Sequence, residues 1–325
     1  MHAIIFKNLG PPSVLEWSTV PDLVPGPDQL LVRVKAAALN RADLLQRRGK
    51  YPPPPGESSI LGLEIAGDVS AIGKNVTHYQ LGDRVFGLVG GGGYAEYCLI
   101  DAHTAMPIPE NLTYSEAAAI PEAFLTANEA LFNLGGLEMG ETVLIHAGGS
   151  GIGTAAIQLA KMVGAIVLTT IGSPEKIRKV ETLQPAAIFN YKEENFIETV
   201  QSYTHDHGVD VLIDFLGGPY FVRNLQILSI TGRLISIGSM SGGNAEINLD
   251  LVRKKRLQIK GLIMRSRSLK EKRMITERFK EKWLPLIATG ELKPVIDSVF
   301  AMKDASIAHE YMEKNAHVGK IILEI

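Results

Sequence analysis

The amino-acid sequence predicts an α/β fold, in which a doubly wound parallel sheet is joined to a smaller β-rich domain. Two observations support this prediction. Between residues 142 and 263, apolar and β-branched segments alternate with segments of helical spacing, which is the pattern of βαβ units. Before about residue 120, the apolar segments are short and separated by Gly and Pro turns, as in a small, partly open β-barrel.

Length and composition limit the classes of protein to consider. The chain has 325 residues and a formal net charge of −2, so it can form two domains, and its charge gives no support for nucleic-acid or membrane binding. Its single cysteine, Cys98, excludes an internal disulfide and a multi-cysteine zinc site. No apolar run reaches the roughly 20 residues that span a bilayer. Residues 1–7 are typical of a strand and not of a secretory signal, and we expect a cytoplasmic protein.

The elements follow in order along the chain. We expect the barrel strands at residues 30–36, 67–73, 82–87 and 94–100, and helical stretches at 115–120 and 121–134. Six strand candidates of a parallel sheet follow at residues 142–147, 165–171, 186–189, 209–215, 232–238 and 257–263. An amphipathic helix at 276–286 and a strand at 320–324 complete the chain, and we expect the strand to return to the first domain.

The domain boundaries follow from this change of pattern. We expect residues 1–120 to form the β-rich domain, completed by residues 265–325. Residues 121–264 then form the domain with the parallel sheet.

A glycine-rich turn, Gly148-x-Ser150-x-x-Gly153, separates the strand candidate 142–147 from a helical segment. Glycines let the backbone approach a pyrophosphate, and a helix N-terminus supplies N–H donors and the positive end of a dipole. The middle glycine of the G-x-G-x-x-G fingerprint is a serine here, and a turn without a ligand is the alternative interpretation. A nucleophile elbow does not fit, because Ile152 stands at its second glycine. The turn residues expected to bind a dinucleotide are Gly148, Ser150, Gly151, Ile152 and Gly153.

The end of the second strand candidate favours NADPH over NADH. It lacks the Asp or Glu that usually binds the ribose 2′-hydroxyl of NAD. Gly172 and Ser173 leave room for a 2′-phosphate, and Lys176 is close enough to pair with it. Ser173 followed by a proline is also an ordinary helix N-cap, which is compatible with a phosphate site. Tyr191, beyond the third strand, is a further candidate for the adenosine end, or a surface tyrosine.

Two polar residues of the β-rich domain are candidates for the reacting end of the cofactor. Asn40 follows the strand at 30–36 and either faces the nicotinamide or closes a turn. Tyr51 precedes the prolines at 52–55, which stiffen its loop, and packing of the tyrosine on these prolines is the alternative. The basic residues 253–256 are more typical of a solvated face than of a nucleic-acid site. The histidines have no ligand spacing, so we expect no metal site.

Together these motifs resemble the medium-chain dehydrogenase/reductase superfamily and, within it, the zinc-free quinone oxidoreductases of the zeta-crystallin group. The resemblance covers nearly the whole chain, and it is carried by residues 38–44, 51–56, 61–64, 118–123, 145–148, 150–159 and 265–267. It implies a GroES-like barrel domain and a Rossmann domain with a six-stranded sheet. Zinc-dependent members have a cysteine at the position of Asn40 and a His-Glu pair at Leu63-Glu64. The resemblance therefore implies chemistry without a metal.

The resemblance also implies a function and a set of site residues. It implies NADPH-dependent reduction of a quinone by hydride transfer, with Tyr51 and Ser150 lining the substrate pocket and Asn40 beside the reacting groups. The expected cofactor contacts outside the Gly-rich turn are Asn40, Thr126, Ser173, Lys176, Tyr191, Gly217, Gly238, Ser239, Met264 and Ser266.

Two other functions remain open on the sequence. Reduction of an activated C=C bond in an enone, alkenal or enoyl thioester uses the same cofactor and the same hydride. An NADPH-binding protein with a structural or RNA-binding role is the alternative that is not an enzyme. The resemblance further implies a homodimer that pairs through the strand at 257–263.

Overall fold

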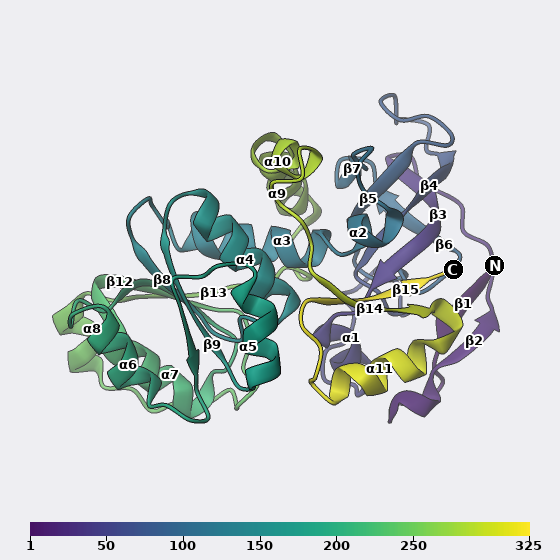
Figure 1. Ribbon diagram of the computed structural model, residues 1–325. Coiled ribbons are helices and arrows are strands. Elements are labelled where there is room, and N and C mark those ends of the chain that lie inside the picture. The colour runs from purple at the N-terminus through teal and green to yellow at the C-terminus, as the bar shows by residue number, and fades with distance from the viewer. The chain divides into compact units, whose positions relative to one another are not determined.

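Two sheets organise the chain, and each belongs to its own compact unit. The computed structural model describes residues 1–325. The first unit contains residues 1–125 and 265–325, and the second contains residues 126–264. Figure 1 follows the chain by colour through both units.

The first unit is a GroES-like, partly open barrel, as expected. Its seven-stranded sheet has the order β14-β15-β3-β4-β5-β7, and β6 pairs with β3. Alternate residues of β3 are buried, because side chains of a strand point in turn to opposite faces. The strands are β3 (Gln29–Ala38), β4 (Glu64–Ile72), β5 (Arg84–Leu88), β6 (Tyr97–Asp101), β7 (Ala105–Pro107), β14 (Ile296–Ala301) and β15 (Lys320–Glu324).

Strand β15 lies between β14 and β3, although it is far from β3 in the sequence. It runs parallel to β14 and antiparallel to β3, with Ile322 opposite Ala38. Figure 1 shows this yellow strand reaching the purple strand β3. Its side chains from Ile321 to Leu323 are fully buried, so the end of the chain forms part of the core of the first unit.

Smaller elements complete the first unit. Strands β1 (His2–Ile5) and β2 (Glu16–Thr19) form a separate antiparallel pair. The α-helices that lie wholly within this unit are α1 (Arg41–Arg47), α2 (Tyr114–Ala118), α9 (Leu269–Lys282), α10 (Leu284–Ala288) and α11 (Ala305–Glu313). Helix α3 (Pro121–Asn128) crosses the boundary between the units and continues as a π-helical stretch, Glu129–Leu134, in agreement with the predicted helical stretch 121–134.

The second unit is a Rossmann domain with six parallel strands in the order β10-β9-β8-β11-β12-β13. The chain starts at the central strand β8, adds β9 and β10 on one side, and returns to β11 on the other. The strand order thus reverses between β8 and β11, and doubly wound sheets bind ligands beside the carboxyl ends of the strands at such a reversal. The strands are β8 (Thr142–Ile145), β9 (Ile166–Ile171), β10 (Ala187–Asn190), β11 (Val209–Asp214), β12 (Leu228–Ser236) and β13 (Gln258–Gly261).

Helices cover both faces of this sheet. Figure 1 shows α4 (Gly151–Met162) and α5 (Pro174–Glu181) on one side, and α6 (Phe196–Tyr203), α7 (Gly218–Ile227) and α8 (Leu249–Lys255) on the other. A buried apolar core forms where α6 and α7 pack on the strands, with Phe196, Val200 and Leu225 among its members. A continuous apolar run such as Val143 to Ile145 is fully buried, as expected for a strand covered on both faces.

Two predicted elements differ most from the structure in where they begin. The helix expected at 276–286 begins at Leu269, where Ser268 and Glu271 form a capping box, and a break at Trp283 separates α9 from α10. The strand expected from residue 232 begins at Leu228, because an irregularity in its pairing with β11 accommodates the turn-like residues Thr231 and Gly232. None of the helices is both long enough and apolar enough to cross a membrane.

Candidate active site

The Gly-rich turn joins β8 to α4, beside the point where the strand order of the second unit reverses. Ser150 caps α4, since its Oγ accepts a hydrogen bond of 3.0 Å from the N–H of Gly153. A Cβ at position 148 would lie 2.0 Å from Thr169 Oγ1, and a Cβ at position 153 would lie 2.4 Å from the carbonyl oxygen of Ala147. Both positions therefore require glycine, which lets the turn and the N-terminus of α4 pack closely on the neighbouring backbone and on Thr169. This geometry fits a dinucleotide pyrophosphate.

Most residues expected to contact the cofactor follow the carboxyl ends of the parallel strands. Such ends lie along one edge of a parallel sheet, so the fold gathers these residues there. They are Ser173 after β9, Tyr191 after β10, Gly217 after β11, Gly238 and Ser239 after β12, and Met264 after β13.

Four of the predicted residues meet where β9 and β10 end. Ser173 is the N-cap of α5, and its Oγ accepts a hydrogen bond of 3.3 Å from the N–H of Lys176. The Tyr191 ring lies on Gly172, because a Cβ at position 172 would be 2.5 Å from the tyrosine oxygen. The strand ends in Ile171, Gly172 and Ser173 without a carboxylate. The N-terminus of α5 and the Tyr191 ring therefore lie at the end of β9, which is where the ribose of a dinucleotide binds in this fold.

The end of β11 brings two further predicted residues together. Asp214 is fully buried and accepts hydrogen bonds from the N–H groups of Leu216 and Gly217. This holds Gly217 at a φ of 63°, and a Cβ there would lie 3.0 Å from the Cα of Ser239. Thr126, at the start of the second unit, is buried, and its Oγ1 has no hydrogen-bond partner.

In the first unit, Asn40 belongs to a buried polar cluster. Its Oδ1 accepts a hydrogen bond of 2.7 Å from Lys320 Nζ, and its Nδ2 donates one of 2.8 Å to Glu64 Oε1. Lys320 Nζ also lies 2.6 Å from Glu64 Oε1, and both side chains are at least 95% buried. Lys320 was not predicted as a site residue. The only sequence signal was a lysine in an otherwise apolar strand segment.

Two more carboxyl groups of this region have shifted pKa values. Burial raises the pKa of Asp43 to about 6, although the N–H groups of Asn40 and Gly62 donate to it. Burial, and then the neighbouring Glu64 carboxylate, raise the pKa of Glu122 to about 7. Both residues lie in segments that carry the family resemblance, 38–44 and 118–123. Neither was predicted as a site residue, because their burial and their charged neighbours come from segments that are distant in the sequence.

Tyr51 is half-buried, and its hydroxyl makes no hydrogen bond within the protein. Burial, and then the charge of Glu122, raise the pKa of this phenol above its ordinary value, while Arg265 opposes the shift. The phenol is therefore protonated at neutral pH and can donate a hydrogen bond. Tyr51, Asn40 and Ser266 belong to the first unit, and Ser150 belongs to the second.

The chemistry of the side chains around Asn40 does not fit zinc. Asn40 and Leu63 offer neither a thiolate nor an imidazole, and Glu64 is paired with Lys320. No group of three or more His, Cys, Asp or Glu side chains is placed to hold a metal ion.

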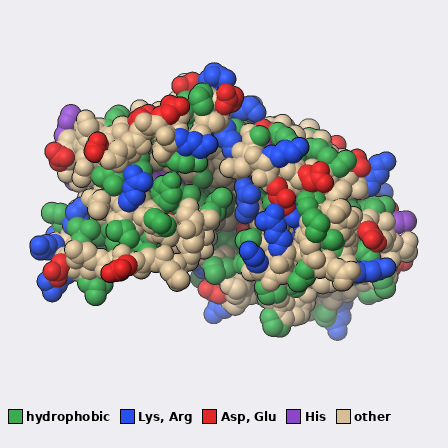
Figure 2. All heavy atoms as spheres, turned by 90° about the horizontal axis from the view of Figure 1, so that it is seen from below, with side chains coloured by type: hydrophobic (Ala, Val, Ile, Leu, Met, Phe, Trp, Pro, Cys, Tyr) green, Lys and Arg blue, Asp and Glu red, His purple; other side chains and the backbone are tan.

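The basic cluster at 253–256 is partly structural. Lys255 Nζ donates to the carbonyl oxygens of Gln226 and Leu228, and Arg253 pairs with Asp250 at 2.7 Å. Figure 2 shows acidic and basic side chains interspersed with apolar ones over the face that it draws. Two of the four basic side chains of the cluster are thus engaged within the protein.

Comparisons with known proteins agree with this geometry. Residues 26–110 match the family model of the alcohol dehydrogenase GroES-like domain, and residues 151–284 match that of the zinc-binding dehydrogenases. The chain is 34% identical to the quinone oxidoreductase of Rattus norvegicus over 327 residues, covering 99% of this chain and 97% of the relative.

Solved structures are similar over the same length. The Escherichia coli quinone oxidoreductase complexed with NADPH superposes with a TM-score of 0.88 and 29% identity over 100% of both chains. The CurK enoyl reductase superposes with a TM-score of 0.89 and 29% identity over 99% of this chain and 98% of its own. The first comparison supports a nicotinamide cofactor.

With its barrel unit, its Rossmann unit and relatives similar along its full length, the chain belongs to the zeta-crystallin-like quinone oxidoreductases, which are oxidoreductases of the medium-chain dehydrogenase/reductase family.

Proposed function

We propose that this enzyme reduces quinones with NADPH by hydride transfer and without a metal. The observation that carries the proposal is the end of β9. There Ser173 accepts a hydrogen bond from the N–H of Lys176, the Tyr191 ring lies on Gly172, and the strand end has no carboxylate. A 2′-phosphate would accept hydrogen bonds from the N-terminus of α5 and pair with the Lys176 ammonium. An NADH site would instead be expected to offer a carboxylate to the ribose 2′-hydroxyl.

The residues of the second unit would bind and orient this cofactor. The Gly-rich turn would hold the pyrophosphate, and Gly217, Gly238, Ser239 and Met264 would line the same sheet edge. A contact from the cofactor would also supply the partner that Thr126 Oγ1 lacks within the protein. NADPH supplies the hydride when bound, and the chain supplies position and exclusion of water.

The substrate would meet Tyr51 and Asn40 of the first unit and Ser150 of the second. Tyr51 carries a protonated hydroxyl without an internal partner, so it can donate a hydrogen bond to a quinone oxygen. Ser150 accepts a hydrogen bond from Gly153 with its Oγ, which leaves its O–H hydrogen as a second donor. Asn40 would complete the reacting end of the site, with its amide held by Lys320 and Glu64. A quinone is electron-poor, so it accepts a hydride without strong acid or metal.

Reduction of an activated C=C bond is the second candidate function. The similarity to the CurK enoyl reductase favours it, and the same cofactor geometry serves both reactions. The two differ in whether the hydride reaches a quinone or the β-carbon of an enone.

Steady-state oxidation of NADPH and of NADH, with ortho-quinones, para-quinones and enones in EDTA, tests the proposal. We expect fast, EDTA-insensitive oxidation of NADPH with a quinone. Lys176→Ala should raise the KM for NADPH roughly 10-fold, the loss of about one charged contact, with little effect on NADH. Lys179→Ala, an exposed lysine of the same helix, is the control. Faster turnover of enones would favour the second candidate, and equal use of both cofactors would contradict the 2′-phosphate site.

Two proposals concern the state of the protein in the cell. We place the enzyme in the cytoplasm, where its single thiol, Cys98, stays reduced, and cell fractionation tests this. Strand β13 lies at the edge of the Rossmann sheet with exposed Ile259 and Ile263 nearby. We propose that this edge pairs with a second copy to form a homodimer.

A further inference from the structure

Arg265 is a buried arginine that contacts the Tyr51 loop, residues 51–57. Its side chain is 5% exposed. Its Nε donates a hydrogen bond of 2.9 Å to the carbonyl oxygen of Gly90, and its Nη1 donates one of 3.4 Å to that of Tyr51. The guanidinium carbon lies 5.5 Å from the centre of the Tyr51 ring, within the range of a cation–π contact. One side chain therefore contacts both the backbone and the ring of Tyr51.

The surroundings of Arg265 differ from those of an ordinary structural ion pair. No carboxylate lies within ion-pair distance, and its Nη2 is buried without a hydrogen-bond partner. Burial lowers the pKa of the guanidinium, and more distant carboxylates such as those of Asp43 and Glu57 oppose this shift. A guanidinium buried without a paired carboxylate costs stability. The hydrogen bonds of Arg265 go to the backbone of the Tyr51 loop and of Gly90.

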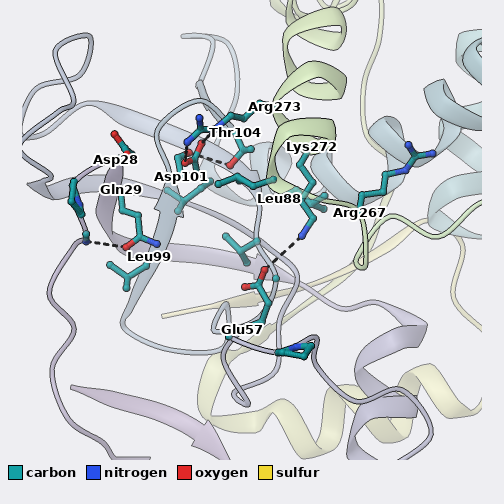
Figure 3. Close-up of a pocket in the computed structure, with 18 residues that line it drawn as sticks. Asp28, Gln29, Glu57, Leu88, Leu99, Asp101, Thr104, Arg267, Lys272 and Arg273 are labelled. Carbon is teal, nitrogen blue, oxygen red and sulfur yellow. Dashed lines mark hydrogen bonds and ion pairs between the residues drawn. The ribbon is translucent and has the colours of Figure 1, made fainter.

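The Tyr51 loop depends on such contacts from outside. The prolines at 52–55 have no N–H groups, and within the loop the N–H of Glu57 donates to the carbonyl oxygen of Pro54 at 3.1 Å. Its far end is held by Lys272 of α9, whose Nζ lies 3.6 Å from Glu57 Oε1. Figure 3 shows these two side chains pointing toward each other in a pocket of about 520 Å³. The segment 265–272 thus contacts the loop at both ends.

Gly90 completes this arrangement. A Cβ at position 90 would lie 2.0 Å from the Glu57 carboxyl group, so the carboxyl group packs directly on the backbone to which Arg265 donates. Arg265, Gly90 and Glu57 therefore form a continuous set of contacts from the Tyr51 ring to the end of the loop.

We infer that Arg265 is a positioning residue, which fixes the Tyr51 ring and backbone so that the phenol hydroxyl meets the substrate oxygen. Lys272 supports it by holding the far end of the loop. The inference rests on the proposed role of Tyr51 in binding substrate. It follows that the loss of Arg265 acts through Tyr51, and that it has no further effect once the Tyr51 hydroxyl is absent.

A double-mutant cycle with Tyr51→Phe tests this coupling. We expect Arg265→Met to lower kcat with a quinone by roughly 10-fold, because misplacing a group by a fraction of an ångström weakens its contact in the transition state, with the KM for NADPH unchanged. In the Tyr51→Phe background the same change should have little effect on kcat. Arg265→Lys should keep part of the kcat that Arg265→Met loses, because it retains the positive charge. Arg273→Met is the matched control, because Arg273 pairs with Asp101 in the same pocket and does not contact the loop.

Hydrogen exchange of residues 50–58 supplies a readout that needs no activity. Arg265→Met and Glu57→Gln should increase exchange in this segment, and Arg273→Met should not. Unchanged exchange together with additive losses in the cycle would overturn the inference. Increased exchange in a protein that reduces no quinone would uphold the positioning of the loop and reject the proposed function. Should Arg265→Met fail to fold, Arg265→Lys and Glu57→Gln carry the same comparison.

Discussion

In the first unit, the ammonium group of Lys320 has three hydrogens and three close acceptors. These are Glu64 Oε1 at 2.6 Å, Asn40 Oδ1 at 2.7 Å and the carbonyl oxygen of Leu39 at 2.8 Å. Every donor is satisfied, so the buried charge is compensated. The same contacts fix which end of the Asn40 amide faces Lys320, because a lysine can only donate.

Removing the Lys320 ammonium should lower the free energy of unfolding. Lys320→Met leaves Glu64 buried without its cation, and we expect a loss of about 3–5 kcal/mol in unfolding free energy, measured by urea denaturation. The double variant Lys320→Met/Glu64→Gln should recover part of the loss, because the uncompensated charge is gone. A single variant as stable as the wild type would contradict this account.

A second buried pair, Arg47 and His309, predicts that the stability of the fold depends on pH. Arg47 is fully buried and its Nη1 donates to His309 Nδ1 at 2.9 Å. Burial, and then the charges of Arg47 and Arg48, lower the pKa of His309 to about 3. A histidine that is neutral in the folded state and titrates near 6.5 when unfolded loses its stabilising contribution as the pH falls below 6.5.

His309→Gln should therefore change the pH dependence of stability. Between pH 7 and pH 5 the variant should gain about 2 kcal/mol relative to the wild type, measured as the difference in urea unfolding at the two pH values. Glu122, whose pKa is raised to about 7, contributes with the opposite sign over this range, so the variant must be compared with the wild type and not with a theoretical slope. Parallel pH profiles for the two proteins would refute the assignment.

At the scale of elements, the sequence predicted those strands and helices whose residue pattern is local. Buried parallel strands appear as continuous apolar runs, and all six of the second unit were located. Helix α9 was placed too late, because its first turns are polar and lack an apolar stripe; the signal that could have placed its start is the capping box of Ser268 and Glu271.

The residues of the candidate site also fall into two groups, those that local sequence predicted and those that it did not. Ser173, Lys176 and the Gly-rich turn follow strand ends, so motif and spacing predicted where they lie. Lys320, Glu122 and Arg265 could not be predicted as members of a site, because their partners are far along the chain. Lys320 meets Asn40 across 280 positions, and Arg265 meets Tyr51 across 214. Only the pairing of β15 with β3, and the return of residues 265–273, bring these side chains together.

At the scale of the whole molecule, the unpaired edge of β13 predicts the oligomeric state. Ile259 is 41% and Ile263 is 57% exposed, which is unfavourable for an edge left in water. Light scattering after size exclusion should give twice the chain mass of 35.3 kDa. Ile259→Lys should shift the mass toward that of the monomer, because two copies would bring like charges together. Exposed Met139, remote from β13 in the sequence, offers Met139→Lys as a control. A monomeric wild type would exclude the dimer.

The insertion of β15 beside β3 has a consequence for folding during translation. Residues 1–125 are synthesised first. Their sheet lacks β15, which carries the Lys320 ammonium that pairs with Glu64, until residue 320 has been synthesised. At roughly 5–20 residues per second, that delay is about 10–40 s. The Rossmann unit, contiguous in the chain, is complete earlier. Nascent chains of this enzyme thus present an unfinished barrel to chaperones and proteases until translation reaches β15.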